Sequence, residues 1–142
     1  MAGYSGTPLV KKIGIKQQQR LFFKSAPASF AKDLGPLPDG TELLKAAKPP
    51  VDVAVLFVKG RAELEKELMP VAEKIASNGM VWVGWPKKSS GVKTDMTEDV
   101  VRAVALPQGL VDVKVCAIDE TWSGLKLVWR KEKRAAVASR TS

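Results

Sequence analysis

The sequence predicts an α/β fold with three layers, in which helices cover both faces of a mostly parallel sheet of about six strands. Apolar runs alternate along the chain with segments of helical spacing, which is typical of consecutive strand–helix units. Two of these runs, Val53–Val58 and Met80–Trp85, have no polar face, as in strands that are covered on both sides. Two short strands around a turn follow, and they predict an antiparallel hairpin at one edge of the sheet.

The first half of the chain is predicted to contain short elements. Pro8 suits the first position of a helix, and Gly14 and Gly35 are typical of the residue directly after a helix end. Ser25 is the expected N-cap of the second helix. The elements are, in order, a helix over Thr7–Gly14, a strand over Arg20–Lys24, a helix over Pro27–Gly35 and a strand over Thr41–Ala46.

The second half is predicted to hold the longer elements. Pro70 is expected to end one helix and begin another, because proline breaks the hydrogen-bond ladder of a helix interior. Asp95 and Thr97 compete as caps of the last helix. The elements are a strand over Val53–Val58, helices over Arg61–Leu68 and from Pro70 to Gly79, a strand over Met80–Trp85, a helix around Val100–Leu106, and strands over Leu110–Ile118 and Leu125–Trp129.

The length of 142 residues predicts a single domain. We expect residues 1–130 to form it, and the polar, basic residues 131–142 to form a flexible C-terminal tail. The net charge is +8, of which residues 1–20 contribute +4 and the tail +3, so the rest of the chain is nearly neutral. Weak, non-specific binding of polyanions through the two basic ends is therefore expected.

The composition excludes several kinds of chemistry. Histidine is absent, and the chain has a single cysteine, Cys116. The commonest general base, histidine-containing catalytic triads, thiolate zinc sites and internal disulfides are thereby excluded. No catalytic residue, metal site or cofactor is predicted. An apolar leader and a run long enough to span a membrane are also missing, so we expect a cytoplasmic protein with no membrane contact.

The pattern from Val53 to Trp129 resembles the C-terminal half of a class I methyltransferase. It contains an apolar strand after Asp52, a helical stretch, a second apolar strand, a helix and a closing hairpin. Three segments are similar to a bacterial family of small proteins of unknown function, namely Tyr4–Lys16, Trp85–Val100 and Val111–Leu125. The resemblance implies a Rossmann-like fold of the class I methyltransferase type and brings no activity with it.

Three places depart from the pattern of working methyltransferases. Such enzymes have a glycine-rich turn after the first strand, an acid at the end of the second, and an acceptor-binding motif after the strand that corresponds to Val53–Val58. Here those places read Lys24–Ser29 without glycine, Leu44–Ala46 without an acid, and Lys59–Arg61. These departures predict a methyltransferase-like fold that has lost the cofactor-binding residues of that fold.

The best candidate site is the loop Lys87–Thr94, here named the lysine loop, which follows a buried strand and precedes a helix. Ligands of open α/β sheets bind at the carboxyl ends of strands. Ammonium groups, hydroxyls, a glycine and a helix N-terminus together favour an anion. The spacing of a nucleotide-binding P-loop is absent, and a solvated loop with surface lysines is the alternative. The candidate residues are Lys87, Lys88, Ser89, Ser90, Gly91, Lys93 and Thr94.

The turn Asp119–Gly124 is expected at the same edge of the sheet as the lysine loop, provided that its first strand runs parallel to the second apolar strand. Asp119 or Glu120 would then pair with a lysine of the loop, either as an exposed salt bridge or as part of a site. Trp122 is the tryptophan best suited to stack on a ligand, because the strand tryptophans are expected to pack in the core. Asp119 and Trp122 therefore join the candidate site.

These observations favour a non-catalytic binding or interaction module that recognises an anionic small molecule or a protein partner. The alternative is a minimal S-adenosylmethionine-dependent methyltransferase or a nucleotide-handling enzyme, which requires a deep pocket bounded by Ser25, Trp85 and Lys87. A third function is nucleic-acid binding through the basic ends. It predicts strong salt dependence and a loss of binding when residues 131–142 are removed.

Overall fold

The computed structural model of the chain describes residues 7–141, and only the backbone of residues 140 and 141. Residues 1–6, where the segment Tyr4–Lys16 begins, and Ser142 at the end of the predicted tail lie outside the described residues. Within the described part of the chain, six strands form one sheet in the order β2-β1-β3-β4-β6-β5.

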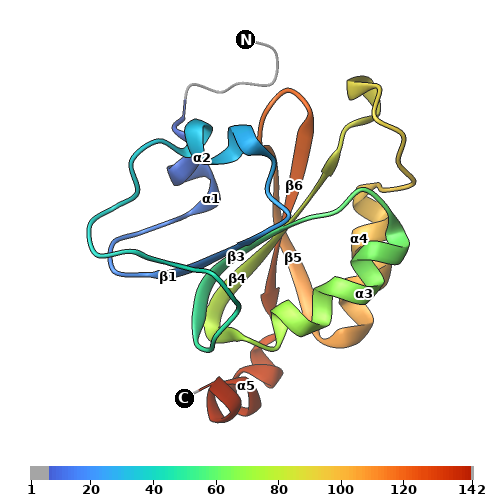
Figure 1. The fold of residues 1–142 in the computed structure, drawn as a ribbon. Coiled ribbons are helices and arrows are strands. Elements are labelled where there is room, and N and C mark those ends of the chain that lie inside the picture. The colour runs from blue at the N-terminus through green and yellow to red at the C-terminus, as the bar shows by residue number, and fades with distance from the viewer. Residues whose placement is uncertain (1–6, 142) are drawn as a thin grey trace.

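Helices and strands alternate along most of the chain, except that β2 is followed by β3 and β5 by β6 (Figure 1). The strands are β1 (Arg20–Lys24), β2 (Glu42–Leu44), β3 (Val51–Phe57), β4 (Ile75–Pro86), β5 (Leu110–Ala117) and β6 (Trp122–Trp129). The helices are α1 (Leu9–Ile13), α2 (Ala28–Leu34), α3 (Arg61–Ala72), α4 (Glu98–Ala105) and α5 (Arg134–Thr141), with 3₁₀ turns η1 (Lys88–Ser90), η2 (Leu106–Gln108) and η3 (Lys131–Lys133). None of the helices among the described residues combines the length and the apolar character that crossing a membrane requires.

The sheet is mostly parallel. Strand β1 runs parallel to β2 and β3, and β3 runs parallel to β4, whereas β6 is antiparallel to both β4 and β5. Helices α1 and α2 lie on one face of the sheet and α3 and α4 lie on the other (Figure 1). The predicted fold class is thus confirmed, including the antiparallel hairpin at one edge.

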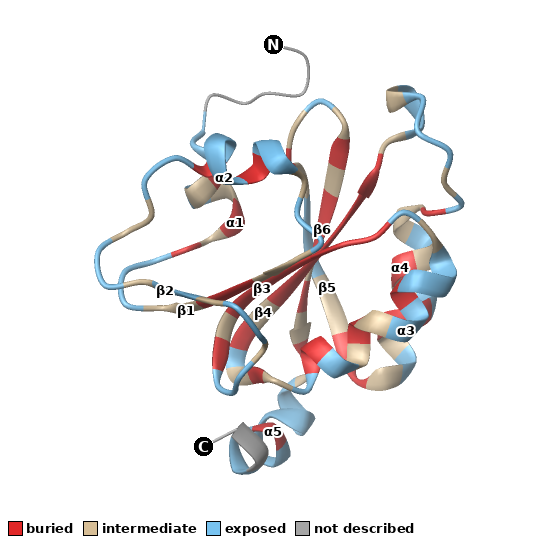
Figure 2. Ribbon diagram, in the orientation of Figure 1, coloured by how far each residue is buried: buried red, intermediate tan, exposed pale blue. Residues whose placement is uncertain are grey.

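Two apolar cores lie on the opposite faces of the sheet, and Figure 2 shows the buried strands between them. The larger core, on the α3/α4 face, joins the strands to α3, α4 and α5. The smaller core, on the α1/α2 face, is rich in aromatic rings, of which Phe30 and Phe57 meet edge-on with centroids 5.0 Å apart. Trp82 belongs to it and donates from Nε1 to the backbone oxygen of Ile13 at 2.9 Å, which ties α1 to β4.

The prediction of two helices on either side of Pro70 is wrong. Helix α3 runs without a break from Arg61 to Ala72, with Pro70 inside it. Pro70 lies in the last turn and removes the one hydrogen bond that its own backbone nitrogen would donate, while the buried side chains of Leu68 and Val71 hold this turn against the sheet. Packing therefore outweighs the local signal of the proline.

The prediction that Asn78 and Gly79 end a helix is also wrong, because both residues belong to β4. The register between β3 and β4 shifts in this region. A Cβ on Gly79 would lie 2.9 Å from the backbone oxygen of Asp52 and 3.0 Å from that of Val51, closer than side chains tolerate. Glycine is thus required by a close approach of two strands.

Three local details refine the predicted boundaries. Pro27 precedes α2 directly, so Ser25 is not its cap, and Ser25 instead adopts a left-handed conformation with a φ of 59°. Of the two competing caps of α4, Thr97 is the one used, since its Oγ1 accepts a hydrogen bond from the backbone nitrogen of Val100 at 3.2 Å. The hairpin turn is shorter than predicted, because β6 already begins at Trp122.

The residues expected to form a flexible tail contain η3 and α5. Val137 on α5 is only 1% exposed and belongs to the larger core. Arg134 donates from Nε to the backbone oxygen of Trp129 at 3.3 Å. Helix α5 therefore packs at the end of the sheet opposite to the lysine loop (Figure 1).

Candidate functional site

The carboxyl ends of the parallel strands meet at the upper edge of the sheet in Figure 1, together with the lysine loop and the hairpin turn. The chain leaves β1 toward β2 on one side and leaves β3 toward β4 on the other, so the strand order reverses between β1 and β3. Open α/β sheets bind their ligands at such a switch point. The groups at this edge therefore make up the candidate site.

The lysine loop is anchored to the hairpin turn. The backbone nitrogen of Lys87 donates to the backbone oxygen of Thr121 at 2.8 Å, and its Nζ donates to the backbone oxygen of Asp119 at 2.8 Å. The expectation that the loop and the turn share one edge of the sheet is thus confirmed. The ammonium group of Lys87 is engaged by the chain itself.

The hairpin turn uses its polar and aromatic residues for its own structure. Oδ1 of Asp119 accepts hydrogen bonds from the backbone nitrogens of Thr121 and Trp122, both at 2.7 Å. The expected pairing of this carboxylate with a lysine is replaced by the bond from Lys87 to the Asp119 backbone. Trp122 packs in the core with 9% exposure and meets Phe57 edge-on at 5.1 Å, instead of presenting its ring to solvent.

The rest of the lysine loop forms a compact turn. Ser90 donates from Oγ to the backbone oxygen of Lys87 at 2.6 Å and accepts from the backbone nitrogen of Val92 at 3.2 Å. Gly91 has a φ of 79°, which only glycine adopts readily. Lys88, Ser89 and Lys93 are exposed, so two ammonium groups and one hydroxyl face solvent.

Residues Thr94–Met96, here named the strap, join the lysine loop to the turn after β3. Oγ1 of Thr94 donates to the backbone oxygen of Lys59 at 2.6 Å, and Oδ1 of Asp95 accepts from the backbone nitrogen of Arg61 at 2.8 Å. Met96 is buried in the larger core with 2% exposure. Thr94 therefore serves the strap, and α4 begins beyond it, so the lysine loop does not run directly into a helix N-terminus.

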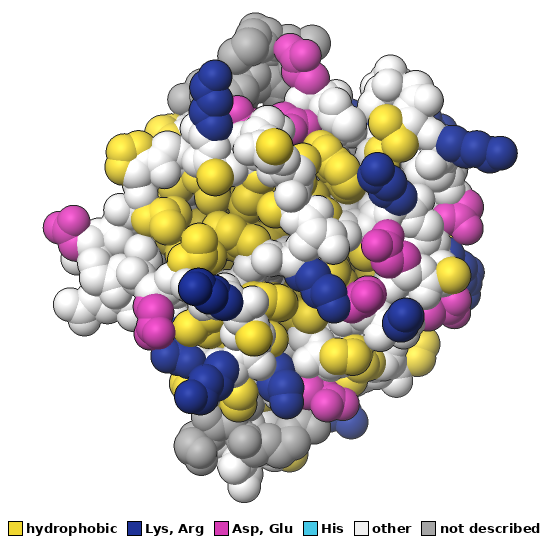
Figure 3. All heavy atoms as spheres, viewed as in Figure 1, with side chains coloured by type: hydrophobic (Ala, Val, Ile, Leu, Met, Phe, Trp, Pro, Cys, Tyr) yellow, Lys and Arg dark blue, Asp and Glu magenta, His cyan; other side chains and the backbone are white. Residues whose placement is uncertain are grey.

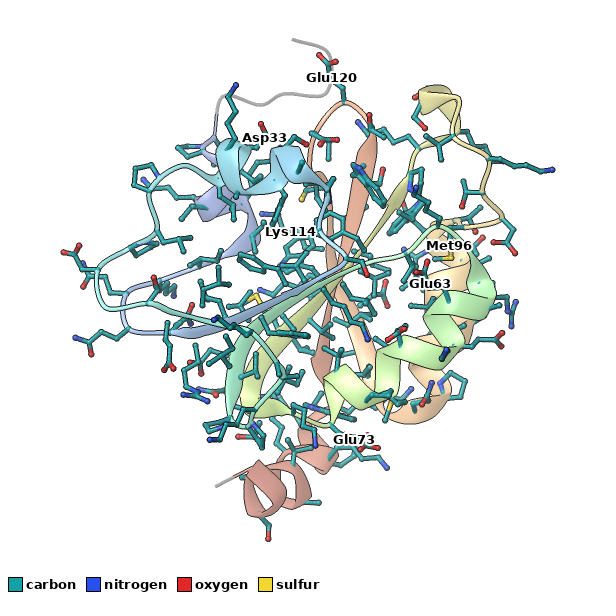
Figure 4. All side chains as sticks on the ribbon, viewed as in Figure 1. Asp33, Glu63, Glu73, Met96, Lys114 and Glu120 are labelled. Carbon is teal, nitrogen blue, oxygen red and sulfur yellow. The ribbon has the colours of Figure 1, made fainter. Side chains whose placement is uncertain are left out.

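Two further carboxylates meet polar groups at the same edge. Lys24, the last residue of β1, forms an ion pair with Glu67 of α3. Glu63 accepts a hydrogen bond through Oε1 from the backbone nitrogen of Lys59 at 2.8 Å. Figure 4 shows Glu63 on α3 and Glu120 at the tip of the hairpin turn, where it projects away from the molecule. The pair of Lys24 and Glu67 joins segments that are distant in sequence, so no spacing or motif indicates it.

A cluster of charges lies away from this edge, between α4 and β5. Arg102 contacts Glu98, Asp99 and Asp112 at 3.0, 3.1 and 2.9 Å respectively. The guanidinium group lowers the pKa of Asp112 through their hydrogen bond, although partial burial acts in the opposite direction. The i,i+4 spacing of Glu98 and Arg102 predicts their ion pair from the sequence. The arrangement fixes α4 to an edge strand.

The described residues offer neither a metal site nor a continuous basic face on the side in view. No group of three or more acidic or cysteine side chains among residues 7–139 is placed to hold a metal ion. The space-filling view in Figure 3 shows hydrophobic side chains over the middle and left of the molecule, with charges of both signs mainly around them. The positive side chains thus form no continuous basic patch on this side.

A family model matches most of the chain. Residues 38–131, well over half of the chain, match a family described as "Protein of unknown function (DUF3052)". The chain belongs to this family. None of the curated proteins matches this DUF3052 protein in sequence.

Solved structures similar to the DUF3052 protein include proteins described as methyltransferases. TrmN from Thermus thermophilus has a TM-score of 0.54 and 14% identity over 86% of this chain, which spans less than half, 47%, of TrmN. A SAM-dependent methyltransferase from Aquifex aeolicus has a TM-score of 0.53 and 15% identity, over 88% of this chain and 89% of that one. Aeropyrum pernix fibrillarin with natively bound S-adenosyl-L-methionine has a TM-score of 0.54 and 13% identity, over 89% and 70% of the two chains. At such identities the likeness establishes the fold alone.

Proposed function

We propose that this DUF3052 protein is a binding or interaction module without catalytic activity, and that the exposed part of the lysine loop takes an anionic ligand or protein partner. One observation carries the proposal: Asp95 occupies the N-terminus of α3 by accepting the hydrogen bond from the backbone nitrogen of Arg61. A helix N-terminus beside a switch point is where a methyltransferase-like fold would hold a ligand anion. An incoming anion would have to displace a carboxylate that is tethered to the chain.

The neighbouring groups support the same conclusion. Lys24 at the end of β1 has Glu67 as its counter-ion, and the backbone oxygen of Lys59 is bonded by Thr94. Each of these groups would otherwise be available to a cofactor at the switch point. Because these groups are bonded within the chain, they support a site that is closed to a cofactor and has no catalytic activity.

The lysine loop provides the outward surface. Lys88 and Lys93 are exposed, and the seven residues that follow Lys87 include no acid. The loop is held in one conformation by the bonds of Lys87 to the hairpin turn and by those of Ser90. A preformed loop that carries two ammonium groups loses little conformational freedom on binding, which suits an anionic partner.

A thermal-shift comparison tests the proposal. The purified protein is heated alone and with S-adenosylmethionine, S-adenosylhomocysteine, ATP or inorganic phosphate, because a ligand of the folded state raises its Tm by mass action. We expect no shift with the two adenosyl compounds and a rise with ATP or phosphate. The rise is expected to vanish in the double variant Lys88→Gln with Lys93→Gln. It should persist in Lys45→Gln with Lys66→Gln, which removes the same charge from exposed positions elsewhere.

A shift with an adenosyl compound would contradict the proposal and favour a methyltransferase. One observation points to that second candidate. Ser25, in the turn directly after β1, has a φ of 59°, the left-handed region in which glycine is preferred. Strained backbone is often found at ligand sites, and methyltransferase-like folds place a glycine-rich turn at this point. Transfer of a labelled methyl group from S-adenosylmethionine to a cell extract would establish this alternative.

A further inference from the structure

The hairpin β5–β6 places two lysines directly opposite each other. In its antiparallel register Lys114 pairs with Lys126, and directly opposed residues share one face of a sheet with Cβ atoms about 5 Å apart. Lys126 is also in register with Trp82, which belongs to the smaller core, so both lysines lie on the α1/α2 face. Figure 4 labels Lys114 near the centre of the view. Like charges in this relation destabilise a sheet, so the pair is a cost to the fold.

Two more lysines extend this pair along β5. Lys12 of α1 donates from Nζ to the backbone oxygen of Ala117, the last residue of the strand, at 2.9 Å. The side chain of Lys133 lies against Gly109 at the other end, where a Cβ would be 3.0 Å from its Cε. A strand from Leu110 to Ala117 is about 25 Å long. The four lysines, here named the β5 lysine strip, thus follow the whole length of an edge strand.

Carboxylates are scarce beside Lys114 and Lys126, whereas Lys133 directly follows the exposed Glu132. Helix α1 and strands β4 and β6 contain no aspartate or glutamate. The single acid of β5, Asp112, is bonded to Arg102 of α4 on the opposite face. Among the described residues, neither Lys114 nor Lys126 belongs to an ion pair. Within residues 7–139, the ammonium groups of these two lysines therefore have no ion-paired carboxylate on their own face of the hairpin.

We propose that the β5 lysine strip binds the phosphate backbone of a nucleic acid strand, independently of its sequence. Lys114 and Lys133 are exposed, whereas Lys12 and Lys126 are half-buried. Ammonium groups spaced along a strand act as point charges, which suits a polymer with one charge on each repeating unit. A small anion would instead need a pocket of converging donors, and these lysines are spread along an edge strand. The repulsion between Lys114 and Lys126 would be relieved when a phosphate group lies between them.

The proposal differs from binding through the basic ends, which the composition alone suggests. Lys114 and Lys126 belong to neither end. They lie between residues 20 and 131, in the part of the chain whose net charge is nearly zero. The fold places Lys12 at the end of β5 and Lys133 beside its start, and these two lysines come from opposite ends of the chain. Replacement of Lys114 and Lys126 therefore distinguishes binding through the β5 lysine strip from binding through the basic ends.

Fluorescence anisotropy with a labelled single-stranded RNA of mixed sequence, about 20 nucleotides long, tests the proposal at about 50 to 200 mM salt. We expect Lys114→Gln with Lys126→Gln to weaken binding about tenfold at low salt. The slope of log K against log salt should fall by about 1.4, because each neutralised phosphate of a single strand accounts for about 0.7. The matched variant Lys45→Gln with Lys66→Gln has the same net charge and should bind nearly as the unaltered protein does.

A stability measurement on the same variants shows whether they fold. Because the two lysines repel each other, Lys114→Gln is expected to leave the Tm unchanged or raise it by about 1–2 °C while it weakens RNA binding. Equal loss of affinity in the matched variant would mean that net charge alone is responsible, and this would overturn the proposal.

Two other probes decide the kind of anion. Polyglutamate of similar length should compete poorly with RNA, and effective competition would overturn the proposal in favour of an acidic protein. Inorganic phosphate at millimolar concentration should change the Tm of the variant Lys114→Gln with Lys126→Gln as much as it changes that of the unaltered protein. If phosphate raises the Tm of the unaltered protein more than that of the variant while RNA fails to bind, the site takes a small anion and the proposal is wrong.

Discussion

Oδ1 of Asp95 lies 2.8 Å from the backbone nitrogen of Arg61, and the two residues are 34 positions apart in the sequence. The contact closes the N-terminus of α3 with a carboxylate from the strap, next to the point where the strand order reverses. It acts as a helix cap supplied from a distant segment, since it satisfies one of the donors that a helix leaves open at its start. The same bond links the stability of α3 to the closure of the candidate site.

Replacement of Asp95 by alanine should therefore lower stability and open the helix N-terminus. Loss of a cap costs about 1 kcal/mol, which corresponds to a decrease of about 3 °C in Tm for a chain of this size. Thermal unfolding measures this decrease, and Glu120→Ala, at an exposed position of the hairpin turn, is the control with no expected change. Sulfate should raise the Tm of Asp95→Ala more than that of the unaltered protein. Equal effects of sulfate on both would contradict the closure of this site by Asp95.

The bond between Arg102 and Asp112 should make stability depend on acid pH. Because Arg102 lowers the pKa of Asp112 in the folded state, the contribution is fully present above the pKa of the unfolded chain, near 4, and is lost as the pH falls through the lower folded pKa. The Tm difference between the unaltered protein and Asp112→Asn is therefore expected to be largest near pH 7 and to shrink below about pH 4. Thermal unfolding from neutral to strongly acid pH measures it, and a difference that stays constant would argue against the ion pair.

Val137 tests whether the C-terminal residues belong to the folded domain. Its side chain is 1% exposed in the larger core, so Val137→Ala should cost about 2 kcal/mol from lost burial and the resulting cavity. Val113→Ala is the matched control, because Val113 on β5 is 57% exposed. Urea unfolding of both variants measures the difference. Equal stability of the two would favour the flexible tail that the composition predicts.

The sequence predicts the sheet better than the connections within it. The runs Val53–Val58 and Met80–Trp85 are apolar on both faces, and this property follows from their buried position between two helical layers. The signals at Pro70 and Gly79, in contrast, are local, while the α3 end and the β4 start are decided by burial and by the approach of β3. Tertiary packing thus overrides the local signals that proline and glycine provide.

The candidate site could be predicted in part for a similar reason. The proximity of the lysine loop and the hairpin turn follows from the direction of the strands, and the bond between Lys87 and Asp119 agrees with it. The Asp119 carboxylate accepts hydrogen bonds within its own turn, and Asp95 accepts one from the backbone of Arg61. Both contacts depend on side-chain positions that residue spacing does not predict. Trp122 was expected near a ligand because the turn was predicted to be longer; in β6 its ring packs against Phe57.

Gly79 should tolerate a methyl group poorly. A Cβ would lie 2.9–3.1 Å from three backbone oxygens of β3 and β4, and backbone atoms have little room to shift. We expect Gly79→Ala to destabilise the protein by about 1–3 kcal/mol. Gly60→Ala is the control: Gly60 has a φ of −150°, and its nearest contact would be Oδ1 of Asp95 at 3.5 Å. Circular dichroism during heating compares the two variants, and similar Tm values would contradict the close approach.

Ser25 gives a test that separates backbone strain from a lost cofactor site. A residue other than glycine with a φ of 59° carries a cost of about 1 kcal/mol, which Ser25→Gly should relieve. The Tm is therefore expected to rise by about 2–3 °C. If the protein is a binding module whose inner edge is closed by Asp95 and Glu67, restoring glycine after β1 should not create affinity for S-adenosylhomocysteine. Isothermal titration of the variant with S-adenosylhomocysteine measures this affinity. If binding appears with this one substitution, the crevice is open enough for a cofactor. That result would favour the methyltransferase alternative over a site closed by Asp95 and Glu67.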